Sequence, residues 1–99
     1  MATLRHAKMY NDGWTKEHDS KNGWNVWKYR ESFDIPEFPQ WGMGMILVSV
    51  PMQKGTKKPG SKDKVFSAWY QTNKDNRTSK DNMTLNEARN WIREEVSKQ

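Results

Sequence analysis

Five lysines in one short segment are the strongest chemical signal in this chain. Between positions 53 and 64 they stand among Gly55, Pro59 and Gly60, residues typical of a loop that turns back. Lysines on a flexible loop reach phosphate oxygens without requiring one fixed geometry. The lysines are Lys54, Lys57, Lys58, Lys62 and Lys64. The spacing predicts a nucleic-acid contact, although the same residues also suit a loop that is only kept soluble and protected against strand pairing.

The positive charge of the chain is concentrated in this loop. The formal net charge is +5; residues 1–52 hold equal numbers of acidic and basic side chains, and residues 65–99 hold one basic side chain in excess. A clustered charge indicates an anionic partner more strongly than a basic pI spread over a surface. Arg77 and Lys80 extend the predicted patch.

Three aromatic residues are candidates for the same binding surface. Trp27, Tyr29 and Trp69 are of interest because an exposed ring beside a cation can stack on bases or fill a pocket of a protein partner. The remaining tryptophans are interpreted as packing anchors; they are Trp14, Trp24, Trp41 and Trp91.

No arrangement of side chains predicts an enzyme or a metal centre. His6 and His18 are isolated in the sequence and are interpreted as surface or turn residues. The chain contains no cysteine and no His-x-x-x-His spacing, which excludes disulfides and thiolate ligands and disfavours a zinc site. Asp12, Glu17 and Asp19 fall in a polar segment and are interpreted as solvated charges. We expect a non-enzymatic protein without a cofactor or a metal.

Length and apolar content bound the architecture. A chain of 99 residues suits one domain, and a hydrophobic content of 33% with six tryptophans allows a small core. The longest apolar run, residues 43–50, is far below the roughly 20 residues needed to cross a bilayer, and residues 1–6 lack a signal-peptide core. We expect a cytoplasmic protein with no membrane contact.

Residues 43–50 and 65–72 have the composition of two β-strands joined by the lysine loop. Pairing centred near Lys58 places alternate residues of both strands on one face, which is the predicted core. These residues are Ile46, Val48, Val50, Phe66, Ala68 and Tyr70. The opposite face presents Met45, Leu47 and Trp69 beside serine and glutamine side chains, and it is the first candidate for a binding surface.

The preceding region predicts a third strand and a loop. Residues 24–30 alternate well enough to form a strand, with Trp27 and Tyr29 on one face. Both faces of this strand carry aromatic residues, so the pattern leaves open which face is inward. Residues 32–42 contain two prolines between apolar residues and are expected to form an ordered loop over an edge or end of the sheet.

Two polar regions show no clear periodic spacing of apolar residues. Residues 1–22 are expected to form a poorly defined arm anchored by Trp14, in which residues 3–10 are either a short edge strand or irregular. Residues 73–82 are polar and long enough to be a flexible crossover.

The clearest local pattern lies near the C-terminus. Thr84-Leu85-Asn86-Glu87 is a capping box, in which the threonine hydroxyl accepts from the amide of Glu87 and the glutamate carboxylate reaches back. Apolar residues then recur with helical period, and Trp91 is the expected main anchor. The pattern predicts a helix over residues 84–97 that lies across one face of the sheet.

Together these elements predict an α+β fold. We expect a sheet of three or four mainly antiparallel strands packed against one C-terminal helix. The whole chain, residues 1–99, is interpreted as a single domain with an arm over residues 1–22, a basic hairpin loop over residues 53–64 and a helix over residues 84–97.

A resemblance to known proteins begins at Met43, with the hairpin and its aromatic strand, and includes the run Thr84-Leu85-Asn86-Glu87-Ala88-Arg89-Asn90-Trp91-Ile92. This part, a little over half of the chain, looks like the closing unit of small phage-encoded proteins built from a sheet and a helix. It is also similar to the arm-type DNA-binding domains of tyrosine integrases, in which a three-stranded sheet enters a groove and a C-terminal helix backs it. The hairpin tip is longer here than in those domains. The resemblance implies a phage or mobile-element origin.

We therefore expect an accessory protein that binds nucleic acid, with the lysine loop on phosphates and aromatic residues of an exposed sheet face on bases. The alternative is an inhibitor that binds a host defence or transcription protein through the same face. A third interpretation is an enzyme subunit or a stabilising partner inside a larger assembly. The residues expected to make the contacts are Lys54, Lys57, Lys58, Lys62, Lys64, Trp27, Tyr29, Trp69, Arg77 and Lys80.

Overall fold

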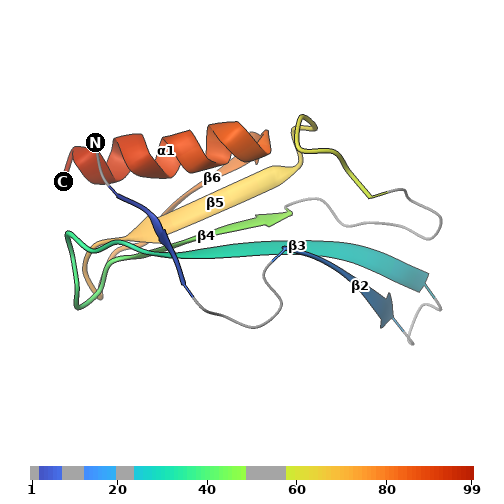
Figure 1. The fold of residues 1–99 in the computed structure, drawn as a ribbon, viewed down its shortest axis with the longest axis horizontal. Helices are drawn as coiled ribbons and strands as arrows, with labels where there is room; N and C mark the ends of the chain where they lie inside the picture. The colour runs from blue at the N-terminus through green and yellow to red at the C-terminus, as the bar shows by residue number, and fades with distance from the viewer. Residues whose placement is uncertain (1–2, 8–12, 20–23, 49–57) are drawn as a thin grey trace.

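A computed structural model describes residues 3–7, 13–19, 24–48 and 58–99, which form one antiparallel β-sheet with a helix on one face (Figure 1). The described elements are β1 (Arg5–His6), β2 (Gly13–Asp19), β3 (Trp24–Asp34), β4 (Met43–Val48), β5 (Phe66–Gln71), β6 (Thr78–Met83) and α1 (Leu85–Ser97). The predicted α+β class is confirmed. The predicted number of strands is wrong, because the described part of the sheet has six.

The long strand β3 has two partners on one edge. The strand order is β1, β3, β4, β5, β6, and β2 also pairs with β3. β1 pairs with residues 33–34 and β2 with residues 24–30, so the two N-terminal strands follow one another along the same edge. Of the two interpretations of residues 3–10, the short edge strand is correct for Arg5–His6.

Two of the strands carry no clear sequence signal. β2 lies in a polar segment, and β6 replaces the flexible crossover that was expected over residues 73–82. Every residue of β6 before Met83 is exposed, so no apolar alternation marks this strand. Backbone pairing with β5 supplies the hydrogen bonds of this edge strand, and pairing across a sheet is invisible to a local pattern.

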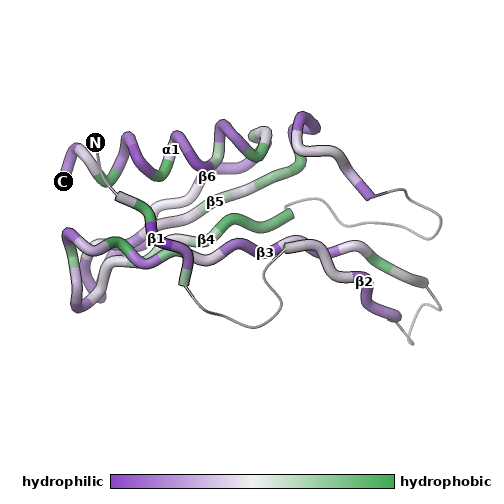
Figure 2. Tube along the Cα trace, viewed as in Figure 1, coloured by the Kyte–Doolittle hydropathy of each residue, from purple (hydrophilic) through white to green (hydrophobic). Residues whose placement is uncertain are grey.

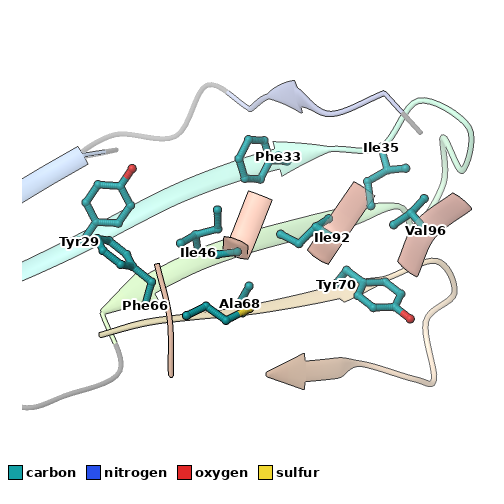
Figure 3. Close-up of a cluster of buried hydrophobic side chains, with 11 residues drawn as sticks. Tyr29, Phe33, Ile35, Ile46, Phe66, Ala68, Tyr70, Ile92 and Val96 are labelled. Atoms are coloured by element: carbon teal, nitrogen blue, oxygen red, sulfur yellow. The ribbon is translucent and has the colours of Figure 1, made fainter. Parts of the chain in front are cut away.

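The core lies between α1 and the sheet. The helix packs mainly over β5 and also over β4 and β6. Ile46, Phe66 and Ile92 are fully buried there, and Figure 3 shows their side chains meeting in this layer. Each such side chain stabilises the fold by about 1.5–3 kcal/mol relative to an exposed position. The full cluster is Tyr29, Phe33, Ile35, Ile46, Phe66, Ala68, Tyr70, Met83, Ala88, Ile92 and Val96.

The helix begins as its capping box predicts. The hydroxyl of Thr84 accepts from the amide of Glu87 at 3.1 Å, and the amide of Thr84 donates to the Glu87 carboxylate at 3.0 Å. The expected role of Trp91 as the main anchor is wrong, because Ile92 is the fully buried residue and Trp91 is half-buried. The Trp91 ring packs edge-on against Tyr70 with centroids 5.4 Å apart. No helix in the described ranges has the length and apolar composition needed to span a membrane.

The β4–β5 pairing confirms the predicted hairpin and corrects its register. Ile46 lies opposite Ala68, two residues from the expected partner Tyr70. Because side chains alternate with a period of two, an even shift leaves every residue on its expected face. The assignment of Ile46, Phe66 and Ala68 to the core is therefore confirmed. Val50 lies outside the described residues.

The turn between β3 and β4 is shorter than expected. Residues 32–34 belong to β3, and the connection begins at Ile35, which is buried. A Cβ at Gly42 would lie 2.6 Å from the carbonyl oxygen of Phe38, so only glycine fits this close approach. The interpretation of Trp41 as a packing anchor is wrong: its side chain is 42% exposed, because Ile35 and Phe38 supply the inward contacts of the turn.

Candidate functional site

The sheet face opposite α1, called the open face below, presents one row of alternate residues from the central strands. The register places Met45 beside Trp69 and Trp69 beside Ser79. No described helix or strand packs across this face (Figure 1). The predicted face assignment of Met45, Leu47 and Trp69 is therefore confirmed.

Trp69 and Arg77 form a stack on the open face. The guanidinium carbon of Arg77 lies 3.8 Å from the centroid of the Trp69 ring. Arg77 is exposed and Trp69 is half-buried, so the pair is open to solvent. The residue opposite Trp69 on β6 is Ser79, whose small side chain leaves room for the arginine to cross the ring. Such a cation–π contact contributes about 0.5–1 kcal/mol at an exposed position.

Apolar side chains of β4 lie on one side of this stack. Met45 and Leu47 are half-buried, and Met43 at the start of β4 is 39% exposed. Figure 2 shows the hydrophobic colour running along β4 toward the start of β5. The open face thus combines an apolar strip on β4 with one aromatic–cation stack on β5, beside the edge strand β6.

The described strands and the adjoining Arg77 bring both cations and acids to the open face. Its cations are Arg5, Lys28, Arg30 and Arg77, and the acids at the same strand positions include Glu17, Asp34 and Asp81. Arg5 pairs with Asp34 at 3.7 Å, and Lys28 pairs with Glu17 at 2.9 Å. Arg77 is exposed above the Trp69 ring.

Trp27 and Tyr29 do not join this surface. They share the α1 side of β3 with Phe33, whereas Trp69 lies on the open face. Tyr29 is buried, its hydroxyl donates to Glu31, and its ring packs against Phe66 with centroids 5.2 Å apart. The expected exposed platform of Trp27, Tyr29 and Trp69 is wrong, because the register of β3, β4 and β5 divides these rings between opposite faces.

The described part of the lysine loop lies beside the start of α1. The Leu85 amide donates to the carbonyl of Ser61 at 2.9 Å, and Lys64 pairs with Glu87 at 3.0 Å. The expectation that the loop and Trp69 lie on the same side of the sheet is wrong for this part, because α1 holds it. Lys58 and Lys62 are exposed. Lys54 and Lys57 lie outside the described residues.

Arg77 and Lys80 do not extend the lysine loop. Arg77 precedes β6, at the end of the β5–β6 hairpin opposite to that loop. Lys80 is exposed on β6 and pairs with Ala68, so it lies on the α1 side rather than beside Arg77.

A polar cluster that sequence reasoning missed joins β1, β3 and α1. The carboxylate of Glu31, which is 5% exposed, accepts from Arg89 Nε at 2.8 Å and from Arg89 Nη2 at 2.6 Å. Tyr29 also donates to this carboxylate, and His6 Nε2 lies 3.3 Å from it. The cluster connects the helix to the edge strand. Among the described residues, no group of three or more His, Cys, Asp or Glu is placed to hold a metal ion.

The environment of the two glutamates lowers both carboxyl pKa values. Burial alone favours a protonated Glu31, but hydrogen bonds from Arg89 and Tyr29 and the charge of Arg89 outweigh it, so the pKa of Glu31 lies below its usual value. The backbone amide of Thr84, followed by Lys64, lowers the pKa of Glu87 to about 2. Burial raises the pKa of Tyr29 well above its usual value, and the neighbouring Glu31 adds to this effect. These groups hold the fold together and leave the open face as the candidate binding site.

Comparison of the chain with protein-family models, with curated proteins and with solved structures found no match. The likeness to phage-encoded proteins and to integrase arm domains stays a prediction from the sequence. The interpretation of the site therefore depends on its geometry.

Proposed function

We propose that the protein binds single-stranded nucleic acid on the open face. The observation that carries this proposal is the Arg77–Trp69 stack, which places an exposed planar cation on an aromatic ring of a face that no described helix or strand covers. A guanidinium in this position offers a surface on which a base can stack and N–H groups that can reach the adjacent phosphate.

The exposed stacking group on the open face favours single strands over duplex. In a duplex the bases stack on each other and show only their edges, whereas in a single strand their faces are free to stack on protein groups. On β4, Met45 lies beside Trp69 and Leu47 lies beside Ser67, and Met45 and Leu47 both offer apolar area to neighbouring bases and sugars. The exposed guanidinium of Arg77 is a group on this face that can pair with a phosphate.

Fluorescence anisotropy with one dye-labelled oligonucleotide, single-stranded or annealed, tests the proposal. We expect the single strand to bind more tightly. We expect Trp69→Ala to weaken its binding roughly 5- to 150-fold, because one stacked base contributes about 1–3 kcal/mol and the Arg77 guanidinium loses the ring that holds it in position. Trp91→Ala on α1 is the matched control that removes an indole from the other side of the sheet. Thermal unfolding checks that both variants are folded. Equal binding by Trp69→Ala and the wild type, or a preference for duplex, contradicts the proposal.

A protein partner is the second candidate, and the exposure of Met43 favours it. Methionine, tryptophan and arginine are enriched in protein–protein interfaces, and all three occur on the open face. A pull-down from nuclease-treated host lysate separates the two candidates. Capture that survives the nuclease and is lost in Trp69→Ala supports an inhibitor of a host protein, whereas loss of capture on nuclease treatment supports nucleic acid.

A further inference from the structure

A second basic and aromatic surface lies on the α1 side of the sheet, beyond the first turn of the helix. Lys16 on β2 pairs in register with Trp27 on β3, and its Nζ lies 5.6 Å from the centroid of the Trp27 ring. Trp14 packs edge-on against Trp27 with centroids 6.4 Å apart. Both indoles are half-buried, so the pair forms a supported platform with part of its surface in solvent.

The lysine loop lies on the same side and at the same end of the sheet as this platform. The rings of Tyr29 and Phe66 are in contact. Trp27 lies two residues before Tyr29, and Lys64 lies two residues before Phe66. β3 and β5 run in the same direction because both pair antiparallel with β4. Trp27 and Lys64 therefore both lie toward the end of the sheet at which β3 and β5 begin, on the α1 side. Lys16, Trp27, Lys58, Lys62 and Lys64 are called the helix-side patch below.

Local contacts fix the loop and satisfy its acidic residues. Asp63 accepts from the amide of Gly60 at 2.8 Å, which closes a turn, and the carbonyl of Ser61 accepts from Leu85. Glu87 is engaged by Lys64 and by the amide of Thr84. Lys58 and Lys62 are exposed, and no ion pair joins either of them to another described residue. The positive charge of the helix-side patch is thus directed outward.

The chemistry of this patch differs from that of the open face. Its cations are lysines, which act as point charges and bind phosphates without fixed orientation, whereas Arg77 presents a planar fork on a ring. Phosphate contacts of this kind carry affinity without base recognition. The ligand that fits is the backbone of a nucleic acid.

We propose that the helix-side patch is a second nucleic-acid site that binds backbone phosphates, so that one chain holds two strands on opposite faces of its sheet. This inference rests on the proposed function in one respect, namely that the ligand is a nucleic acid. The geometry behind it is separate, because the Trp27 and Trp69 rings lie on opposite faces.

Native mass spectrometry of the full chain with oligothymidylate of about six nucleotides, within the range bound by single small domains, counts the strands per chain. We expect the wild type to form a complex of one chain with two strands. Lys58→Gln/Lys62→Gln is expected to bind one strand, with its affinity for that strand reduced less than threefold. The matched control is Lys74→Gln/Lys80→Gln, which removes the same charge from two exposed positions that belong to neither surface and is expected to keep two strands.

The outcomes distinguish the two proposals. A wild type that binds one strand, sensitive to Trp69→Ala, overturns the second site and leaves the open face standing. The second site is also overturned if Lys58→Gln/Lys62→Gln still binds two strands. It is overturned as well if this variant and the control variant both lose one strand. One strand that is insensitive to Trp69→Ala but lost in Lys58→Gln/Lys62→Gln overturns the open-face proposal instead, and no binding by the wild type overturns both.

Discussion

Ile46 and Leu47 are neighbours in β4, yet Ile46 is fully buried under α1 and Leu47 is half-buried on the open face. The strands have apolar residues on both faces, and the helix decides which face becomes the core. Under α1 the buried carboxylate of Glu31 is matched by Arg89. On the open face apolar and cationic groups remain in contact with solvent. This difference teaches that the packing of one helix turns one face of the sheet into the core and leaves apolar groups of the other face in solvent.

The two ion pairs on the α1 side repeat this contrast on a smaller scale. Glu31 and Arg89 meet in two charge-assisted hydrogen bonds at a buried position, whereas Lys64 and Glu87 meet in solvent. A buried carboxylate depends on its partner, but an exposed pair is screened by water.

The largest expected effect is the loss of Arg89. Arg89→Ala leaves the buried Glu31 carboxylate without its cation, and we expect the free energy of unfolding to fall by about 3 kcal/mol, as measured by urea denaturation. Lys64→Ala, the matched removal of the exposed cation, is expected to cost less than about 1 kcal/mol. Glu31→Gln/Arg89→Met should cost less than Arg89→Ala, because the neutral amide still accepts from Tyr29. Equal losses in Arg89→Ala and Lys64→Ala would break the contrast between the two pairs.

Truncation of adjacent residues in β4 measures the difference between the faces directly. We expect Ile46→Ala to lower the free energy of unfolding by about 2–4 kcal/mol, because it opens a cavity under Ile92. Leu47→Ala is expected to cost about 1 kcal/mol, because its side chain is already half in solvent. A cost for Leu47→Ala as large as that for Ile46→Ala would mean that the open face is covered in solution.

The lowered carboxyl pKa values predict a loss of stability in acid. Because the folded-state pKa values of Glu31 and Glu87 lie below the usual value, the two carboxylates stabilise the protein above a pH of about 4.5. This contribution is lost as the pH falls through the folded values, which for Glu87 means toward a pH of about 2. Denaturation from neutral pH to pH 2.5 measures the effect, and Glu31→Gln and Glu87→Gln should each flatten the curve. An unchanged curve in both variants contradicts this assignment.

The smallest expected effect concerns the stack on the open face. Arg77→Lys keeps the charge but loses the planar group over Trp69, so we expect binding of a single strand to weaken by roughly three- to tenfold, or about 1 kcal/mol. The free energy of unfolding should change by less than about 0.5 kcal/mol, because the pair is exposed. Anisotropy titrations and urea denaturation give the two values. Unchanged binding in Arg77→Lys would show that charge alone is needed at this position.

Elements with strong local patterns could be predicted from the sequence. The capping box at Thr84, the strand at residues 24–30 and the β4–β5 hairpin all depend on residues close in the chain. The predicted faces of the β4 and β5 residues are correct although the predicted register is wrong, because the register error is an even number of residues. β2 and β6 were missed because polar edge strands show no alternation.

The candidate site was predicted only in part. The open face and Trp69 followed from alternation in one hairpin, but the stack with Arg77 depends on the turn that leads into β6. The division of Trp27 and Trp69 between two faces depends on register across three strands. The Glu31–Arg89 pair joins residues 58 positions apart, and neither residue carries a local signal for it.

The amino-acid sequence by itself determined the helix and its cap, the alternating faces of the hairpin and the concentration of lysines before β5, because these depend on propensities and neighbours along the chain. Only the tertiary structure decided which face α1 covers, which aromatic rings share a surface and where Lys64 is held. The physical reason is that strand register and helix docking are set by side chains distant in sequence that pack against each other, and their contacts exist only once the sheet has formed.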